Sequence, residues 1–304
     1  MEGWVGVDLG GTKTEVAVLG ADGQMLYRHR EPTPADDYQS VCLLIAHLVR
    51  QAVQSTGLAW PQRLGCGIPG CLDPQTRRVR GANTQVLNGE RLQDDLEHLL
   101  NLSVRLENDA NCLAMSEATD GAGVGASCVF AVIVGTGCGG GLCIDGQVRT
   151  GRHALAGEWG HNPLPWPTPD ELTTPACWCG LQGCFETWVS GPGWSREHFR
   201  QTSQRLTPPE IIAQMRSGDL LSLRSFEEYA DRLARGLSQV VNLLDPEVVV
   251  LGGGLSNIPE LPPLLERLIP RHSFHRGVHT PVRVAVHGDS SGVRGAAWLA
   301  RDAT

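Results

Sequence analysis

The sequence lacks several features that would each point to a particular class of protein. No stretch of Lys or Arg is dense enough to follow a phosphate backbone, and the formal net charge is −8, so nucleic acid is not expected as a partner. No apolar run approaches the roughly 20 residues that span a bilayer. The N-terminus has neither a basic segment nor an apolar segment of signal-peptide length. The sequence therefore predicts a cytoplasmic protein without a membrane partner.

Low-complexity segments and long linkers are also missing. A single hydrophobic core stops growing near roughly 250–300 residues, so a chain of 304 residues favours two domains. Ten cysteines are present, but a protein of this size does not need disulfides and the cytosol keeps thiols reduced. We therefore expect free thiols, and we interpret five of them as small buried apolar residues: Cys42, Cys66, Cys112, Cys128 and Cys143.

Two parts of the chain begin with the same pattern. Residues 3–28 predict a strand, a glycine turn, a second strand, a turn at 21–23 and a third strand. Residues 128–151 repeat the strand, glycine turn and strand, and Asp-Gly-Gln follows the glycine turn in both parts, at 22–24 and 145–147. Two such hairpins at corresponding places suggest duplication. We therefore expect two related lobes.

Helices and strands alternate in the rest of the chain, which indicates an α/β fold. Apolar residues three or four apart predict helices, and apolar runs that end in glycine or polar residues predict strands. Asp289 or Ser290 is the expected N-cap of the last helix. The predicted helices cover 41–53, 91–100, 110–118, 226–244 and 288–300, and the predicted strands include 104–109 and 247–253.

Glycine-rich turns stand between the paired strands of both hairpins. Because glycine has no Cβ, its backbone N–H groups can approach phosphate oxygens closely. The spacing fits neither a Walker loop nor a dinucleotide-binding fingerprint, and one Gly-Gly-Thr sequence alone is more often only a tight turn. The second hairpin has a similar glycine turn after its first strand, and a further glycine run lies at 252–254. Together these turns favour phosphate binding. The predicted phosphate contacts are Gly10, Gly11, Thr12, Lys13, Gly135, Thr136, Gly137, Gly139, Gly253 and Gly254.

Polar side chains accompany the glycines of the first turn, DLGGTK at 8–13. Thr12 adds a hydroxyl donor and Lys13 adds a positive charge. Asp8 ends the first predicted strand and offers a carboxylate of the kind that holds hydrated Mg²⁺. The sequence therefore predicts that Mg²⁺ binds beside the phosphates at this turn.

Three cysteines lie close together in CWCGLQGC at 177–184. A redox pair would normally show C-x-x-C at a helix start, and a nucleic-acid finger would bring a second ligand pair and a basic helix; neither is present. His161 lies upstream, across a proline-rich loop, and would complete a Cys₃His set typical of structural zinc. The alternative is three buried thiols without a metal. The predicted Zn²⁺ ligands are His161, Cys177, Cys179 and Cys184.

Taken together, these motifs resemble those of the ROK family (repressor, open reading frame, kinase) of sugar kinases. The resemblance covers essentially the whole chain, and the motifs follow the family order. They are DLGGTK at 8–13, GIPG at 67–70, NDAN at 108–111, GTG at 135–137, GEWGH at 157–161, CWCGLQGC at 177–184 and LGGG at 251–254.

The resemblance implies a two-lobed α/β fold, that of the actin-like and hexokinase-like ATPases, with ribonuclease H-like lobes. It implies that ATP and a hexose bind in the cleft between the lobes. The smaller lobe is expected to comprise residues 1–117 with 289–304, and the larger lobe residues 118–288, including the cysteine-rich segment. Family members are often homodimers, so a homodimer is also implied.

The resemblance further implies residue roles. Asp109 is implied to be the catalytic base, which accepts the proton of the sugar hydroxyl during phosphoryl transfer; the alternative is that Asp109 only caps the following helix. An ordinary pKa of about 4 would keep it ionised at neutral pH. The same four zinc ligands are implied by the family. The implied sugar contacts are Asn83, Asn108, Asp109, Glu158, His161 and Glu186.

The first expectation for the reaction is that of a fructokinase, which converts D-fructose and ATP to D-fructose 6-phosphate and ADP. The long loop at 162–176 most resembles that of bacterial fructokinases. An N-acetyl-D-glucosamine kinase is the nearest alternative, because the segments 252–261 and 287–299 resemble both branches; a mannose or glucose kinase is a further one. Val86 stands where many relatives carry Trp, which weakens an inference of the sugar by analogy.

Two other classes of protein are disfavoured. ROK repressors place a helix-turn-helix ahead of the first glycine hairpin, whereas DLGG begins here at residue 8. The presence of Asp8, Thr12, Lys13 and Asp109 also favours catalysis over sensing. An actin-like ATPase that moves protein partners is disfavoured by the cysteine-rich segment and by GEWGH.

Overall fold

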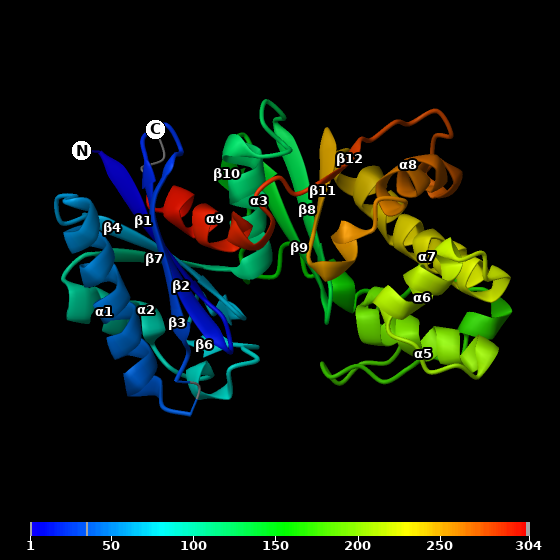
Figure 1. The fold of residues 1–304 in the computed structure, drawn as a ribbon, viewed down its shortest axis with the longest axis horizontal. Helices are drawn as coiled ribbons and strands as arrows, with labels where there is room; N and C mark the ends of the chain where they lie inside the picture. The colour runs from blue at the N-terminus through cyan, green and yellow to red at the C-terminus, as the bar shows by residue number, and fades with distance from the viewer. Residues whose placement is uncertain (1, 35, 302–304) are drawn as a thin grey trace. The chain divides into compact units, whose positions relative to one another are not determined.

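A five-stranded mixed sheet forms the centre of the first of two compact units (Figure 1). The computed structural model describes residues 2–34 and 36–301. The strand order is β3-β2-β1-β4-β7; β1, β2 and β3 are antiparallel neighbours, and β4 and β7 run parallel to β1. The strands are β1 (Gly3–Leu9), β2 (Lys13–Gly20), β3 (Met25–Pro32), β4 (Arg63–Ile68) and β7 (Ser103–Asn108).

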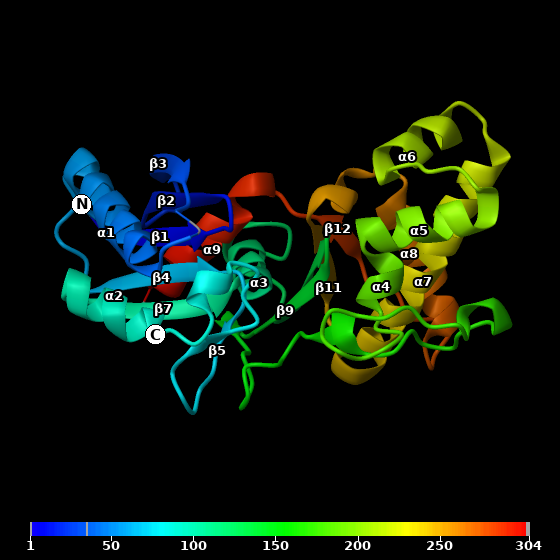
Figure 2. The ribbon, with the colours of Figure 1, turned by 90° about the horizontal axis from the view of Figure 1, so that it is seen from below.

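Helices cover both faces of this sheet (Figures 1 and 2). On one face lie α1 (Tyr38–Thr56) and α2 (Leu92–Leu100), whose apolar sides form the larger core with β1 and β4. On the other face lie α3 (Asp109–Asp120) and α9 (Ser291–Leu299), which close a second, smaller core. A two-stranded sheet of β5 (Cys71–Leu72) and β6 (Val79–Arg80) and the short helix η1 (Gln85–Leu87) lie in the connection after β4.

Glycines let α9 lie directly against its neighbours. A Cβ at Gly65 in β4 would lie 1.7 Å from the Ala296 carbonyl oxygen, and a Cβ at Gly295 would lie 1.8 Å from the Cys112 carbonyl oxygen in α3. No side chain fits at such distances. The C-terminal helix is therefore held by backbone contact with both β4 and α3.

A second five-stranded sheet follows the order β10-β9-β8-β11-β12. Strands β8, β11 and β12 run parallel to one another, and β9 and β10 are antiparallel. The division between the two units falls within β9, because Ala126–Gly140 and Gly157–Ala285 form the second unit. The strands are β8 (Cys128–Val134), β9 (Cys138–Ile144), β10 (Gln147–Val148), β11 (Val248–Gly252) and β12 (Val282–Val284).

The second unit is otherwise mainly helical (Figure 2). Its long helix α7 packs against α6 and α8, and α4 and α5 pack on α7. The helices are α4 (Glu186–Val189), α5 (Gly191–Thr202), α6 (Pro208–Arg216), α7 (Leu220–Leu244) and α8 (Leu261–His272), with short 3₁₀ helices η2 (Trp159–His161), η3 (Pro169–Glu171) and η4 (Gly254–Asn257).

The structure confirms the two hairpins and the predicted helices and strands, with two corrections. The last helix begins at Ser291 after a 3₁₀ turn, η5 (Gly288–Ser290), and Ser290 makes no side-chain capping hydrogen bond. Of the five cysteines expected to be buried, Cys128 is half-buried, because it lies at the start of β8. The first unit comprises 1–125, 141–156 and 286–304, and the lobe boundaries expected from the sequence stay a prediction. No helix of the described residues is long and apolar enough to cross a membrane.

Candidate functional site

The first glycine turn joins β1 to β2 and is closed by backbone and side-chain hydrogen bonds. Gly10 N donates to Lys13 O at 2.9 Å, and Thr33 supports the turn from the end of β3. The Thr33 hydroxyl donates to Gly10 O at 2.8 Å, and Thr33 N donates to Thr12 O at 3.0 Å. Gly11, Thr12 and Lys13 stay exposed, and Lys13 is the only lysine of the chain. The turn thus offers backbone donors and one ammonium group to solvent.

Asp109 lies close enough to Asp8 for its charge to disfavour ionisation of Asp8. Asp8 belongs to β1, and Asp109 begins α3 directly after β7. Partial desolvation, then the Asp109 carboxylate, then Glu15 raise the pKa of Asp8 to about 7, and Arg30 opposes this shift. A cation beside Asp8 would relieve the repulsion, and carboxylate oxygens are the ligands that Mg²⁺ prefers. The residues present therefore fit the predicted Mg²⁺ site.

The surroundings of Asp109 differ from expectation in two respects. Asn108, and not Asp109, caps α3, because its Oδ1 accepts a hydrogen bond from Asn111 N at 2.7 Å. The alternative reading of Asp109 as a helix cap is therefore wrong. Desolvation raises the pKa of Asp109, although Ala110 N donates to its Oδ1 at 2.8 Å; the expected ordinary pKa is corrected upward. The residue as a whole is exposed, so the protein atoms around the carboxylate desolvate it without closing it off from a substrate.

Asn83 is presented at the surface of the first unit by a tightly fixed loop. Asn88 accepts a hydrogen bond from Ala82 N and donates one to Ala82 O, each at 2.9 Å. Asn83 next to it is exposed. Val86 is half-buried and packs against the core of the first unit, so nothing in its packing marks it as the edge of a sugar pocket.

In the second unit, two of the predicted phosphate turns adjoin. Gly135 N donates to Gly137 O at 3.0 Å, and a Cβ at Gly135 would lie 3.7 Å from Gly254 N. Gly253 has a φ of 82°, and a Cβ there would lie 2.4 Å from Val134 O, so only glycine fits. Gly139 has a different role, because its carbonyl accepts a hydrogen bond from the Trp159 indole at 3.0 Å.

Sequence reasoning missed the start of α5, which completes this cluster. Gly191 N donates to Gly135 O at 2.7 Å, and Ser190 caps the helix by accepting from Gly193 N at 3.2 Å. A Ser followed by Gly-Pro-Gly is a helix-start signal that the sequence does contain. What it could not reveal is that this helix start meets the GTG turn.

The three cysteines and His161 come together as predicted. Their candidate ligand atoms all lie within 4.8 Å of one another; Cys179 Sγ lies 3.6 Å from Cys184 Sγ, and Cys177 Sγ lies 3.7 Å from His161 Nδ1. Tetrahedral zinc with thiolates at about 2.3 Å places sulfur atoms roughly 3.8 Å apart. Gly180 and Gly183 turn the chain in left-handed conformations, with φ of 92° and 73°. The geometry fits structural zinc.

Two further residues predicted to bind the sugar, Glu158 and Glu186, lie around this cluster, and His161 within it is a third. Glu158 precedes η2 and His161 ends it; residues three apart in a 3₁₀ helix lie on the same side, and both are half-buried. Glu186 opens α4, its Oε1 accepting from Trp178 Nε1 at 2.7 Å and its Oε2 from Cys138 N at 2.9 Å. Glu186 therefore links the cysteine-rich segment to the end of the GTG turn.

The predicted site residues thus form two groups, one in each unit. The first unit holds Asp8, the GGTK turn, Asn83, Asn108 and Asp109, and the second holds both other glycine turns, the metal ligands, Glu158 and Glu186. A single cleft that brings both groups to one substrate stays a prediction.

Comparison with known proteins agrees with these motifs. The sequence pattern of the ROK family matches residues 4–303. This chain belongs to the ROK family. It is 38% identical over 302 residues to an N-acetyl-D-glucosamine kinase of Yersinia enterocolitica, covering 97% of this chain and 98% of that protein.

Solved structures of ROK proteins share the fold. A ROK hexokinase from Thermus thermophilus has a TM-score of 0.86 and 31% identity, covering 98% of this chain and 97% of the other. A ROK glucokinase from Streptomyces griseus, in complex with glucose and AMPPNP, has a TM-score of 0.78 and 30% identity, covering 98% and 99%. The predicted α/β fold of the actin-like and hexokinase-like ATPases is confirmed.

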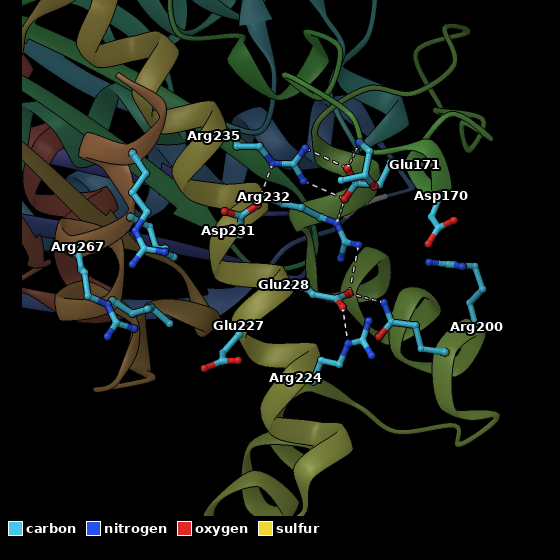
Figure 3. Close-up of a pocket in the computed structure, with 15 residues that line it drawn as sticks. Asp170, Glu171, Arg200, Arg224, Glu227, Glu228, Asp231, Arg232, Arg235 and Arg267 are labelled. Carbon is cyan, nitrogen blue, oxygen red and sulfur yellow. Dashed lines mark hydrogen bonds and ion pairs between the residues drawn. The ribbon is translucent and has the colours of Figure 1, made fainter. Parts of the chain in front are cut away.

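A large cavity of this ROK protein contains none of the predicted site residues. It measures about 650 Å³ and is lined by charged residues of η3, α5, α7 and α8. Figure 3 shows Arg232 and Arg235 reaching from α7 to Glu171, at 2.7 and 2.8 Å. Arg235 also donates to the Pro165 and Trp166 carbonyls, at 2.9 and 2.8 Å. These contacts fasten the loop between His161 and Cys177 to α7.

We expect Glu171→Gln to weaken this attachment in a pH-dependent way. Burial alone would raise the pKa of Glu171, but hydrogen bonds from Arg235, Thr168 N and Arg232 outweigh it and lower the pKa from 4.5 to about 2. A lowered carboxyl pKa adds stability that is complete above the unfolded-state value and is lost as the pH falls toward 2. The variant should lose about 3 kcal/mol of unfolding free energy at pH 7 and much less at pH 3, measured by urea denaturation.

Glu227→Gln is the matched control, because Glu227 is an exposed carboxylate of the same cavity. Equal losses for both variants at pH 7, or an equal loss for Glu171→Gln at pH 7 and pH 3, would contradict the proposed attachment.

Proposed function

We propose that this protein is an ATP-dependent kinase of N-acetyl-D-glucosamine that phosphorylates the 6-hydroxyl group. The observation that carries a kinase function is the pair of carboxylates, Asp8 and Asp109, on the unit that also presents the GGTK turn. The choice of sugar is supported by the 38% identity to the Yersinia enterocolitica N-acetyl-D-glucosamine kinase along 97% of the chain. This similarity favours the alternative raised from the sequence over fructose, the first expectation.

Phosphoryl transfer depends on positioning and on neutralising phosphate charge. We infer that the backbone N–H groups of the three glycine turns, together with Lys13, hold the phosphates of ATP. Asp8 would hold Mg²⁺, which supplies positive charge to the phosphates when bound. These groups orient the phosphate chain, and the remaining task is to accept the proton of the sugar hydroxyl.

We assign this task to Asp109. Its raised pKa makes the carboxylate a better proton acceptor than an ordinary aspartate, as general-base catalysis near neutral pH favours. The hydrogen bond from Ala110 N fixes Oδ1 and leaves Oδ2 for the hydroxyl. Asn83, Asn108, Glu158, His161 and Glu186 would bind the other sugar hydroxyls.

The cysteine set and His161 Nδ1 would hold Zn²⁺, whose part is to fix the fold of residues 161–184. Nδ1 faces the thiols, which leaves Nε2 of His161 to hydrogen-bond the substrate. The metal site thereby determines the ring orientation of a sugar-binding histidine.

The choice of sugar is tested by an ADP-release assay with N-acetylglucosamine, N-acetylmannosamine, glucose, mannose and fructose. We expect kcat/KM to be highest for N-acetylglucosamine, by at least about tenfold over glucose, since even one methylene in an apolar pocket discriminates by roughly 1–3 kcal/mol and a hydrogen-bonded substituent discriminates more strongly. A preference for fructose would restore the first expectation, and transfer to none of these sugars would remove the proposed function.

Asp109→Asn should lower kcat by about 10²- to 10⁴-fold, because the amide cannot accept the hydroxyl proton as a general base. Sugar affinity, measured by calorimetry without ATP, should change little. Asp145→Asn provides the same charge change at an exposed turn with a positive φ, 52°, that Asn tolerates, and it should keep wild-type kcat. Turnover of Asp109→Asn equal to that of this control would remove the proposed base.

Cys179→Ser should lose bound zinc, measured by elemental analysis, and should also weaken sugar binding by about tenfold, because His161 loses its orientation. Cys128→Ser is the control, since Cys128 starts β8 and lies outside the metal set. Loss of zinc with unaltered sugar affinity would show that the metal and the sugar site are not coupled.

A further inference from the structure

Trp178 lies between two of the proposed metal-ligand cysteines, Cys177 and Cys179. The residue is 69% exposed, yet its indole N–H donates to Glu186 Oε1 at 2.7 Å. Its ring also meets the His161 imidazole edge to face, with centroids 5.1 Å apart and an interplanar angle of 83°. Tryptophan usually stabilises a fold by burying its large apolar surface, and here most of that surface stays in water. Stabilising the fold by burial therefore does not explain this residue.

The partner of Trp178 is held from two sides. The other oxygen of Glu186 accepts from Cys138 N at 2.9 Å, and a Cβ at Gly137 would lie 2.8 Å from that oxygen. Glu186 begins α4, and just beyond the end of α4 Gly191 N donates to Gly135 O at 2.7 Å. Contacts at both ends of α4 thus fasten the GTG turn, and Trp178 fixes the carboxylate at the first of these ends.

We propose that Trp178 is a positioning residue for the sugar, acting through Glu186. The inference rests on the proposed function, since it takes Glu186 as a ligand of sugar hydroxyls. An ionised carboxylate has about four lone-pair sites, and two of them are taken by Trp178 and Cys138. The indole N–H fixes the rotation of the carboxylate. The remaining lone pairs of Glu186 then point in one direction, in which they accept hydrogen bonds from sugar hydroxyl groups. Because Trp178 lies between Cys177 and Cys179, this direction depends on the fold of the metal-binding segment.

Trp178→Phe keeps an aromatic ring, removes the N–H donor and makes the ring smaller. A hydrogen bond to a charged group is worth enough to change affinity by about tenfold or more. We therefore expect the KM for N-acetylglucosamine to rise about tenfold, with kcat within about twofold of the wild type and with unchanged metal content. Trp60→Phe is the matched control, because Trp60 is an exposed tryptophan of the first unit, 44% accessible. The KM of this variant for N-acetylglucosamine should stay at the wild-type value.

A double-mutant cycle with Glu186→Ala, which removes the acceptor of the indole N–H, tests whether the effect runs through the carboxylate. If Trp178 acts by orienting Glu186, Trp178→Phe should raise KM about tenfold in the wild-type background and by less than about twofold in the Glu186→Ala background. A purely structural role for Trp178 would give the same factor in both backgrounds.

The outcomes separate this inference from the proposed function. If the wild type phosphorylates N-acetylglucosamine and Trp178→Phe matches Trp60→Phe, the inference is wrong and the proposed function stands. The inference is also overturned if Trp178→Phe loses its metal or fails to fold. It is overturned as well if Trp178→Phe raises KM by the same factor in both backgrounds of the cycle. If the wild type transfers phosphate to none of the five sugars, both fall.

Discussion

The repulsion that the Asp109 carboxylate exerts on Asp8 is the constraint on which the proposed catalytic edge of the first unit depends. Partial desolvation and the neighbouring charge raise the pKa of Asp8 to about 7, so the protein alone holds this pair at a cost in electrostatic free energy. The backbone holds the two carboxylates in this arrangement. β1 pairs in parallel with β4, β4 pairs in parallel with β7, and α3 begins directly after β7. A cation bound beside Asp8 would lower the pKa of this carboxyl group instead of raising it, and the same geometry would then be favourable.

The sheet topology explains why these groups meet at one edge. Strands β1, β4 and β7 are parallel, so their carboxyl ends lie at the same side of the sheet, where ligands of open α/β sheets bind. The GGTK turn leaves that edge from β1, and α3 begins there after β7. In the second unit β8 and β11 are also parallel, and the GTG and GGG turns follow their ends. Parallel strand direction therefore places predicted phosphate-binding turns at the carboxyl edge of the sheet in both units, and the predicted proton acceptor at that edge in the first unit.

The sequence was sufficient wherever the signal was local. The hairpins, α1 and α7 follow from periodicities of two and of 3.6 residues, and the Cys₃His set follows from ligand spacing combined with glycines at 180 and 183. It was insufficient where function depends on contacts between distant residues. Thr33 supports a turn that lies 23 residues earlier, and Glu186 binds the backbone 48 residues before it. The raised pKa of Asp109 was missed for a similar reason, since desolvation is a property of the folded surroundings.

The identity of the sugar is harder to obtain from motifs than the chemistry of transfer. ATP has the same phosphates whichever sugar accepts the phosphoryl group, so glycine turns of this kind indicate phosphoryl transfer and carry no information about the acceptor. The carboxylates that we propose as sugar ligands, Glu158 and Glu186, would accept hydroxyl groups that glucose and N-acetylglucosamine have in common. Discrimination must therefore come from groups that meet the position at which the sugars differ, and a site built to hydrogen-bond a substituent rejects a substrate without it far more strongly than extra apolar contact could. The motifs point to no such group, so similarity along 97% of the chain bears on the sugar more than any single motif does.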